Sequence, residues 1–105
     1  MLLTSGLTAS AAEIFVLSLM NHPRVTRVGE PTSGILSDVM ERHLPNGWMV
    51  TLSNELYRAV DGELYEDRGI PPHVDIRFLD RASRGKDEDA MLEYVIHHMP
   101  RAGLS

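Results

Sequence analysis

Apolar and polar positions alternate along this 105-residue chain in a way that predicts short strands and helices. Residues 1–3 are an unbroken apolar run, which is typical of a strand buried in a parallel sheet. Small residues follow, and from about residue 9 to residue 21 the apolar side chains recur at helical spacing. The side chains expected on the buried face of this helix are Ile14, Phe15, Leu17, Leu19 and Met20.

A second strand is predicted directly after this helix. The helix should end before Pro23, because the residue ahead of a proline is biased away from helical geometry. Val25 and Val28 then mark a strand that stops at Gly29. A strand, a helix and a strand in this order predict a parallel crossover unit and therefore an α/β fold.

The middle of the chain is expected to contain turns and short strands. Residues 32–38 are rich in turn formers and predict a loop. Residues 45–47 (Pro-Asn-Gly) and 61–62 (Asp-Gly) are turn signals, and the latter predicts a hairpin tip. Apolar residues alternate over 48–52 and again over 74–78, and each run predicts a strand.

The last quarter of the chain differs in composition from the rest. A charged segment leads into an amphipathic helix predicted over 87–98, with Leu92, Val95 and Ile96 facing inward. We therefore divide the chain into a core, residues 1–80, and a charged linker with a terminal helix, residues 81–105.

Composition excludes several classes of function. The formal net charge of −5 argues against binding to nucleic acid, which requires a basic surface. The chain has no cysteine, so disulfides and thiolate metal sites are excluded. No apolar run reaches the ~18 residues of a membrane span. The first residues lack the basic region of a secretory signal, and the cellular compartment stays open.

Ser10 is the residue on which the functional interpretation depends. Ser10 and Glu13 have the spacing of a capping box, in which both side chains bind free amides at a helix start. The same position also suits a nucleophile, because the free amides of the first turn would stabilise an oxyanion. A nucleophilic serine needs a base, and the neighbouring sequence offers none. Local pattern alone leaves both readings open.

A family resemblance favours the nucleophile. Five segments occur in a fixed order over about residues 2–78: LTASAAEIF, RVTRVGEPTSG, LPNGWMVTLSN, DGELYEDRGIPP and VDI. Together they resemble the C-terminal processing (tail-specific) serine peptidases, most closely the branch of the tricorn core protease and the interphotoreceptor retinoid-binding protein repeats. The resemblance implies a clp/crotonase-like α/β core of parallel strands with crossover helices. It also implies a peptide or unfolded-protein substrate, with no metal or organic cofactor.

The resemblance assigns roles to individual residues. Ser10 would be the nucleophile and the amide of Ala11 would contribute to the oxyanion hole. Ile35 stands where the tail-specific branch has a lysine base, and because isoleucine cannot accept a proton, a serine–lysine dyad is excluded there. In the other branch a glutamate orients a histidine base, and that role falls on Glu66. A plainer reading makes Glu66 a solvated loop acid beside Arg68.

The base itself is not expected within this chain. The family places its catalytic histidine upstream of the serine, whereas the five histidines here fit surface or structural roles: His22, His43, His73, His97 and His98. The family usually has aspartate at the position of His73. We therefore expect a C-terminal portion of a peptidase core that lacks an upstream half. Such a portion would expose apolar surface and self-associate.

Three functions remain to be weighed. The first is a serine peptidase whose parent protein is exported to the cell envelope or secreted. The second is a non-catalytic module of the same fold that binds a lipid or a peptide, with Ser10 as a helix cap. The third is a structural or interaction fragment.

Overall fold

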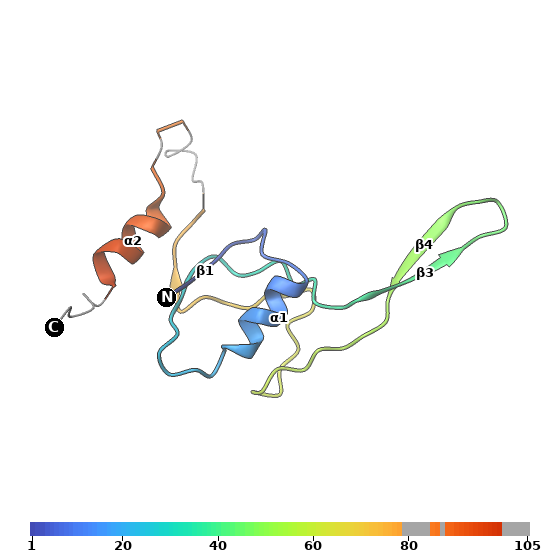
Figure 1. Cartoon of the computed structure of the whole chain (residues 1–105), viewed down its shortest axis with the longest axis horizontal. Coiled ribbons are helices and arrows are strands. Elements are labelled where there is room, and N and C mark those ends of the chain that lie inside the picture. The colour runs from blue at the N-terminus through green and yellow to red at the C-terminus, as the bar shows by residue number, and fades with distance from the viewer. Residues whose placement is uncertain (79–84, 87, 100–105) are drawn as a thin grey trace.

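The computed structural model describes residues 1–78, 85–86 and 88–99. They form two helices and five short strands in two separate sheets (Figure 1). In chain order the elements are β1 (Leu2–Thr4), α1 (Ala11–Ser18), β2 (Arg27–Gly29), β3 (Val39–His43), β4 (Met49–Ser53), β5 (Val74–Asp75) and α2 (Ala90–His98). Neither helix in this described part is long and apolar enough to cross a membrane.

The predicted parallel crossover is present. β1 pairs in parallel with β2, with Leu3 opposite Val28, and α1 connects the two strands. β5 pairs in parallel with the other side of β2, which gives the strand order β1-β2-β5. Val28, at the centre of this sheet, has no exposed surface. The α/β fold with a parallel sheet is therefore confirmed.

Helix α1 is shorter than predicted, and its buried face is only partly the expected one. Val16 and Leu17 are buried, and Ile14 is half-buried. Phe15 was expected on this face, but 57% of its surface is exposed. At about 100° per residue Phe15 lies some 200° from Leu17, so the two side chains leave the helix on opposite sides.

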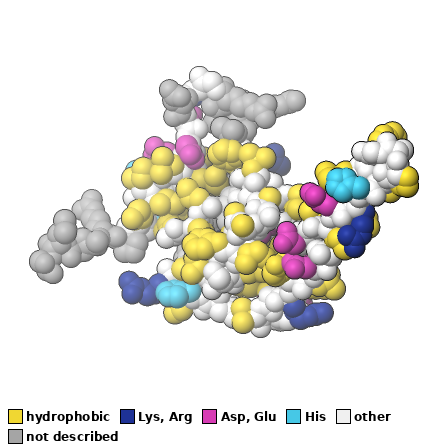
Figure 2. Space-filling model, turned by 45° about the vertical axis from the view of Figure 1, so that its right-hand side comes forward, with side chains coloured by type: hydrophobic (Ala, Val, Ile, Leu, Met, Phe, Trp, Pro, Cys, Tyr) yellow, Lys and Arg dark blue, Asp and Glu magenta, His cyan; other side chains and the backbone are white. Residues whose placement is uncertain are grey.

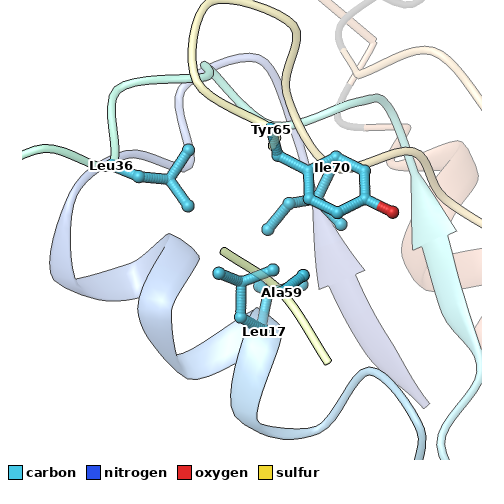
Figure 3. Close-up of a cluster of buried hydrophobic side chains, with 6 residues drawn as sticks. Leu17, Leu36, Ala59, Tyr65 and Ile70 are labelled. Atoms are coloured by element: carbon cyan, nitrogen blue, oxygen red, sulfur yellow. The ribbon is translucent and has the colours of Figure 1, made fainter. Parts of the chain in front are cut away.

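The apolar core gathers beneath α1 from distant parts of the chain (Figure 3). Its buried members are Val16, Leu17, Leu36, Ala59, Tyr65 and Ile70. Only the first two come from a regular element. Leu36 belongs to the predicted loop of residues 32–38, which has no regular structure, and the other three come from residues 59–70. The core therefore fixes loops against α1.

A two-stranded hairpin projects from this body as an arm (Figure 1). The sequence predicted β4 and the turn at residues 45–47 but not β3. The turn closes through a bond from the Leu44 amide to the Trp48 carbonyl oxygen of 2.7 Å. Every residue of β4 is exposed. The arm contributes to the long axis of the molecule, which measures 63 Å.

Helix α2 packs on β2 through one side chain. It begins at Ala90, with the Asp89 carboxylate accepting bonds from two first-turn amides, and Met91 is buried. The predicted inward face was wrong at Leu92 and Ile96, whose surfaces are 46% and 57% exposed. The predicted charged linker lies mostly outside the described residues, so the division into 1–80 and 81–105 stays a prediction.

Candidate active site

Ser10 occupies a strained backbone position at the start of α1. Its φ of 56° and ψ of −125° lie in a region that residues with a side chain rarely adopt. Such a conformation costs on the order of 1–3 kcal/mol and persists only where the surroundings impose it. Two acceptors hold the Ser10 amide: the Ile35 carbonyl oxygen at 2.8 Å and Glu13 Oε2 at 3.1 Å.

The Ser10 hydroxyl is not used to cap the helix. Ser10 and Glu13 have the arrangement of a capping box, in which the Ser10 side chain faces the Glu13 amide and the Glu13 carboxylate accepts a bond from the Ser10 amide. The Glu13 amide donates to the backbone carbonyl oxygen of Ser10 at 2.8 Å, and no side-chain capping bond from Ser10 is present. Ser10 is exposed. Its hydroxyl is therefore accessible at the helix N-terminus.

Glu13 does more than the capping pattern predicts. Its side chain is fully buried. Besides the Ser10 amide, it accepts bonds from the amides of Gly34 at 2.7 Å and Ile35 at 2.9 Å. A buried carboxylate requires such partners, because an unpaired one would be strongly destabilising. Glu13 thus joins the start of α1 to the neighbouring loop.

Glu66 holds the next two residues of the same loop. Its Oε2 accepts bonds from the amides of Leu36 and Ser37, both at 3.0 Å. Glu66 is half-buried, so the reading of a solvated acid is wrong. Its side chain does not line the pocket beside Ser10. Together Glu13 and Glu66 bind four successive amides, those of residues 34–37.

Two glycines let the loop approach the segment that carries Glu66. Gly34 and Gly69 have φ of +78° and +77°. A β-carbon on Gly69 would lie 2.1 Å from the Thr32 carbonyl oxygen, a contact that no side chain tolerates. Thr32 completes the junction, because its Oγ1 accepts a bond from the Ile70 amide at 2.7 Å. Two of the segments that carry the family resemblance are therefore packed backbone to backbone.

A pocket of about 260 Å³ opens beside Ser10. Its lining residues are Ser10, Ala11, Ile14, Leu36, Asp38 and Tyr57. Ser10 and Ala11 thus line the same pocket, and Glu66 is not among its lining residues. Sequence reasoning missed Asp38 and Tyr57, because neither lies in a motif and the fold alone places them near α1.

The neighbours of Tyr57 raise the pKa of its phenol, which is neutral at pH 7 even in an ordinary tyrosine. The causes are hydrogen bonding to the Glu55 side chain, the charge of that carboxylate, burial and, last, the charge of Asp38. The phenol is therefore a hydrogen-bond donor at neutral pH and not a base.

None of the five histidines lines this pocket. His22 and His98 make local backbone contacts, His43 lies on the projecting arm, and His97 faces Glu93 at 3.5 Å. Ile35, at the position of the family's lysine, has 56% of its surface exposed. Among the residues that the structure describes, those that line the pocket beside Ser10 include no imidazole or amine that could act as a base.

His73 has a structural role. Its Nδ1 accepts a bond from the Arg27 amide at 2.9 Å, and its own amide donates to the Arg27 carbonyl oxygen at 2.9 Å. Partial burial, with the nearby Arg27 charge, lowers the pKa of His73. The residue as a whole is exposed, and its Nδ1 lies in a part-buried hydrogen bond. His73 therefore fixes the entry to β5.

Comparison with known proteins decides the family. The model of peptidase family S41 matches residues 1–76. The chain belongs to this family. A curated protein of Chlamydia pneumoniae, named by its locus, is 31% identical over an alignment of 75 residues, and the match covers 69% of this chain. The recognition made from the sequence segments is therefore confirmed.

Solved structures of S41 peptidases are similar to the chain. Mature CPAF complexed with lactacystin has a TM-score of 0.73 and 26% identity over 90% of this chain. The photosystem II D1 C-terminal processing protease has a TM-score of 0.58 and 27% identity over 71% of it. The tricorn protease has a TM-score of 0.77 over 90% of it at 20% identity, which supports the fold alone.

The chain corresponds to a small part of each relative. It spans 12% of the length of the C. pneumoniae protein. It covers 18% of mature CPAF, 10% of the tricorn protease and 19% of the D1 processing protease.

Proposed function

We propose that this S41 chain carries the nucleophile of a serine peptidase and that Ser10 is that nucleophile. The observation that supports this most strongly is the backbone of Ser10. Its strained φ of 56° is held by two hydrogen bonds, while its hydroxyl is exposed and makes no capping bond. Strain of this kind is characteristic of serines placed on a sharp turn ahead of a helix for nucleophilic attack.

The proposed reaction is acyl transfer. Ser10 Oγ attacks the peptide carbonyl carbon, and its proton passes to a histidine base supplied by a part of the catalytic domain outside these 105 residues. The oxyanion accepts a bond from the Ala11 amide, a first-turn amide without a partner inside the helix. The base returns the proton to the leaving amine, and water then hydrolyses the acyl-enzyme. No metal or organic cofactor is required.

Glu66 is proposed to orient the histidine. One of its oxygens, Oε2, is occupied by the amides of Leu36 and Ser37. Those two bonds fix the carboxylate, and Oε1 is proposed to accept the imidazole N–H. A carboxylate in this position holds the tautomer and stabilises the imidazolium.

The central test is covalent labelling with a fluorophosphonate probe. The chain is mixed with the remainder of its catalytic domain, and labelling is followed for the native serine, for Ser10→Ala and for the control Ser53→Ala on the exposed arm. We expect labelling that Ser53→Ala retains and Ser10→Ala abolishes. A folded mixture that remains unlabelled contradicts the proposal.

A Glu66→Gln substitution separates its two roles. The glutamine oxygen can still accept both loop amides, so stability should change little. The loss of charge should lower the labelling rate by about 10²-fold or more, as in other triads that lose their carboxylate. Equal rates with unchanged stability would limit Glu66 to holding the loop.

A second candidate is a non-catalytic binding module of the same fold. It is favoured by Ile35 at the family's lysine position and by the absence of histidine from the lining of the pocket. A lipid or a peptide would then occupy the pocket and Ser10 would not react. A folded, unlabelled mixture that binds peptide would support this candidate.

A further inference from the structure

The pocket beside Ser10 has the dimensions of a site for one side chain. Its volume of about 260 Å³ is below the range of roughly 300–1,000 Å³ in which pockets enclose whole small ligands. Ser10 lies in its wall. A peptide whose carbonyl reaches Ser10 would therefore place a neighbouring side chain in this pocket.

The walls of the pocket differ in character. Ile14 and Leu36 are apolar, and Leu36 is only 3% exposed because it also belongs to the core (Figure 3). Asp38 and Tyr57 supply a carboxylate and an aromatic ring. None of the six lining residues is Lys or Arg. The pocket thus offers an apolar surface and an anionic group.

Asp38 is held in place by its backbone. The Ser37 hydroxyl donates to the Asp38 carbonyl oxygen at 2.7 Å and accepts bonds from the amides of Asn54 and Glu55 at 3.2 and 3.1 Å. The Asn54 amide also donates to the Asp38 carbonyl oxygen at 3.2 Å. These bonds join the backbone at Asp38 to the segment that leads into Tyr57.

We propose that this pocket selects a lysine or arginine side chain of the substrate and that Asp38 is the specificity-determining residue. The proposal rests on the proposed function of Ser10. The apolar stem of such a side chain lies against Ile14 and Leu36, and its cationic head is paired with the Asp38 carboxylate. The face of the Tyr57 ring adds a cation–π attraction.

Other side chains fit less well. An acidic side chain would be repelled by Asp38 and by Glu55, which lies close enough to Tyr57 to perturb its ionisation. A purely apolar side chain would cover Asp38 without compensating for the lost hydration of its carboxylate. The net charge of −5 also favours the approach of a cationic peptide.

The test measures binding rather than turnover. The full 105-residue chain is titrated by NMR with three acetylated, amidated tripeptides that differ only in a central lysine, norleucine or glutamate. Norleucine keeps the stem of lysine without its charge. We expect the lysine peptide to bind about three- to tenfold more tightly than norleucine, the range of one exposed ion pair with a cation–π contact. Shifts should concentrate at the amides of Ala11 and Leu36.

Two substitutions assign the effect to Asp38. Asp38→Asn should reduce the preference for lysine to about onefold, and Asp38→Lys should transfer it to the glutamate peptide. Asp75→Asn on β5 removes the same charge away from the pocket and should leave the preference unchanged. Added salt should weaken the preference for lysine in the native chain, because the pair is close to the surface.

The outcomes separate the two proposals. Preferential lysine binding without fluorophosphonate labelling would refute the nucleophile and keep the specificity assignment. Labelling of Ser10 with equal binding of all three peptides, or with no binding, would overturn the role of Asp38. If Asp75→Asn also loses the preference for the lysine peptide, the preference results from the overall charge of the chain, and the proposal is overturned.

Discussion

The Glu13 carboxylate joins Ser10 to Gly34, which lies 24 residues further along the chain: Oε2 accepts a bond from the Ser10 amide at 3.1 Å and Oε1 accepts one from the Gly34 amide at 2.7 Å. The same buried group therefore fixes the backbone of the proposed nucleophile and the loop beside it. The geometry of Ser10 therefore depends on a fully buried residue that does not line the pocket.

Replacing Glu13 with glutamine should therefore be costly. The glutamine NH₂ group would face at least one backbone amide, so a donor would meet a donor in a buried site. We expect a loss of about 2–4 kcal/mol of unfolding free energy, the range for a lost charged hydrogen bond with an unsatisfied group. Urea denaturation followed by circular dichroism measures it. The matched control, Glu41→Gln on the exposed arm, should change stability by less than about 0.5 kcal/mol.

Substitutions of Ser10 distinguish a helix cap from a nucleophile on a strained backbone. If its hydroxyl capped α1, stability should follow the order Ser, Gly, Ala, with alanine about 1 kcal/mol below serine. The structure gives it no capping bond and a positive φ, so we expect glycine to be at least as stable as serine and alanine to equal serine. Thermal or urea unfolding midpoints of the three proteins distinguish the two roles. A midpoint that is highest for serine, lower for glycine and lowest for alanine would show that the hydroxyl caps the helix.

Features set by short segments could be predicted from the sequence. The strand, helix and strand around Ser10 follow from local periodicity, and the turn at residues 45–47 follows from its residue types. β3 could not be predicted, because Glu41, Arg42 and His43 have no strand pattern and become a strand by pairing with β4. The buried faces of α1 and α2 were partly wrong, since the stripe that is buried depends on what packs against it.

The residues of the candidate site also divide into those that the sequence could identify and those that it could not. Ser10, Ala11 and Glu66 were found through ordered motifs, yet no motif marked Asp38, which lines the pocket only because the loop folds against α1. The sequence identified Glu13 as a capping residue for the Ser10 amide. In the structure its carboxylate also accepts bonds from two amides of the distant loop, those of Gly34 and Ile35. Spacing reports local partners and cannot report those from a distant segment.

His73 should make stability depend on pH. Partial burial and the nearby Arg27 charge lower its pKa below the ordinary 6.5, and Nδ1 accepts the bond from the Arg27 amide only in the neutral ring. Above about pH 6.5 the neutral His73 ring makes its full contribution to the free energy of unfolding. As the pH falls from 6.5 towards the lowered pKa, the unfolded chain takes up the proton first and stability declines. Urea midpoints from pH 5 to 8 should show this decline.

A substitution assigns the decline to His73. His73→Asn keeps an acceptor for the Arg27 amide without a titrating ring, and it should flatten this part of the profile. His43→Asn, on the exposed arm, should leave the profile as it is in the native chain. A profile that His73→Asn does not alter would show that other groups cause the pH dependence.

The projecting arm should make the isolated chain self-associate. Val50 and Leu52 of β4, with Trp48 directly before the strand, alternate along the chain and share one face, and the surfaces of Trp48, Val50 and Leu52 are 70%, 39% and 52% exposed. Figure 2 shows apolar side chains on this arm and over much of the visible body. A two-stranded hairpin without cover is only marginally stable. In a solution of the chain alone, the cover available to this face is a second copy.

Changing this face should therefore weaken association. Sedimentation velocity should give a mass that rises with concentration, and emission of Trp48, the single tryptophan, should shift to the blue as it becomes buried. Leu52→Lys should weaken association by about tenfold or more, because burial of one leucine contributes roughly 1.5–3 kcal/mol. Thr51→Lys, on the opposite face of the same strand, should have a smaller effect. Equal effects of the two lysines would assign the association to charge rather than to the apolar face.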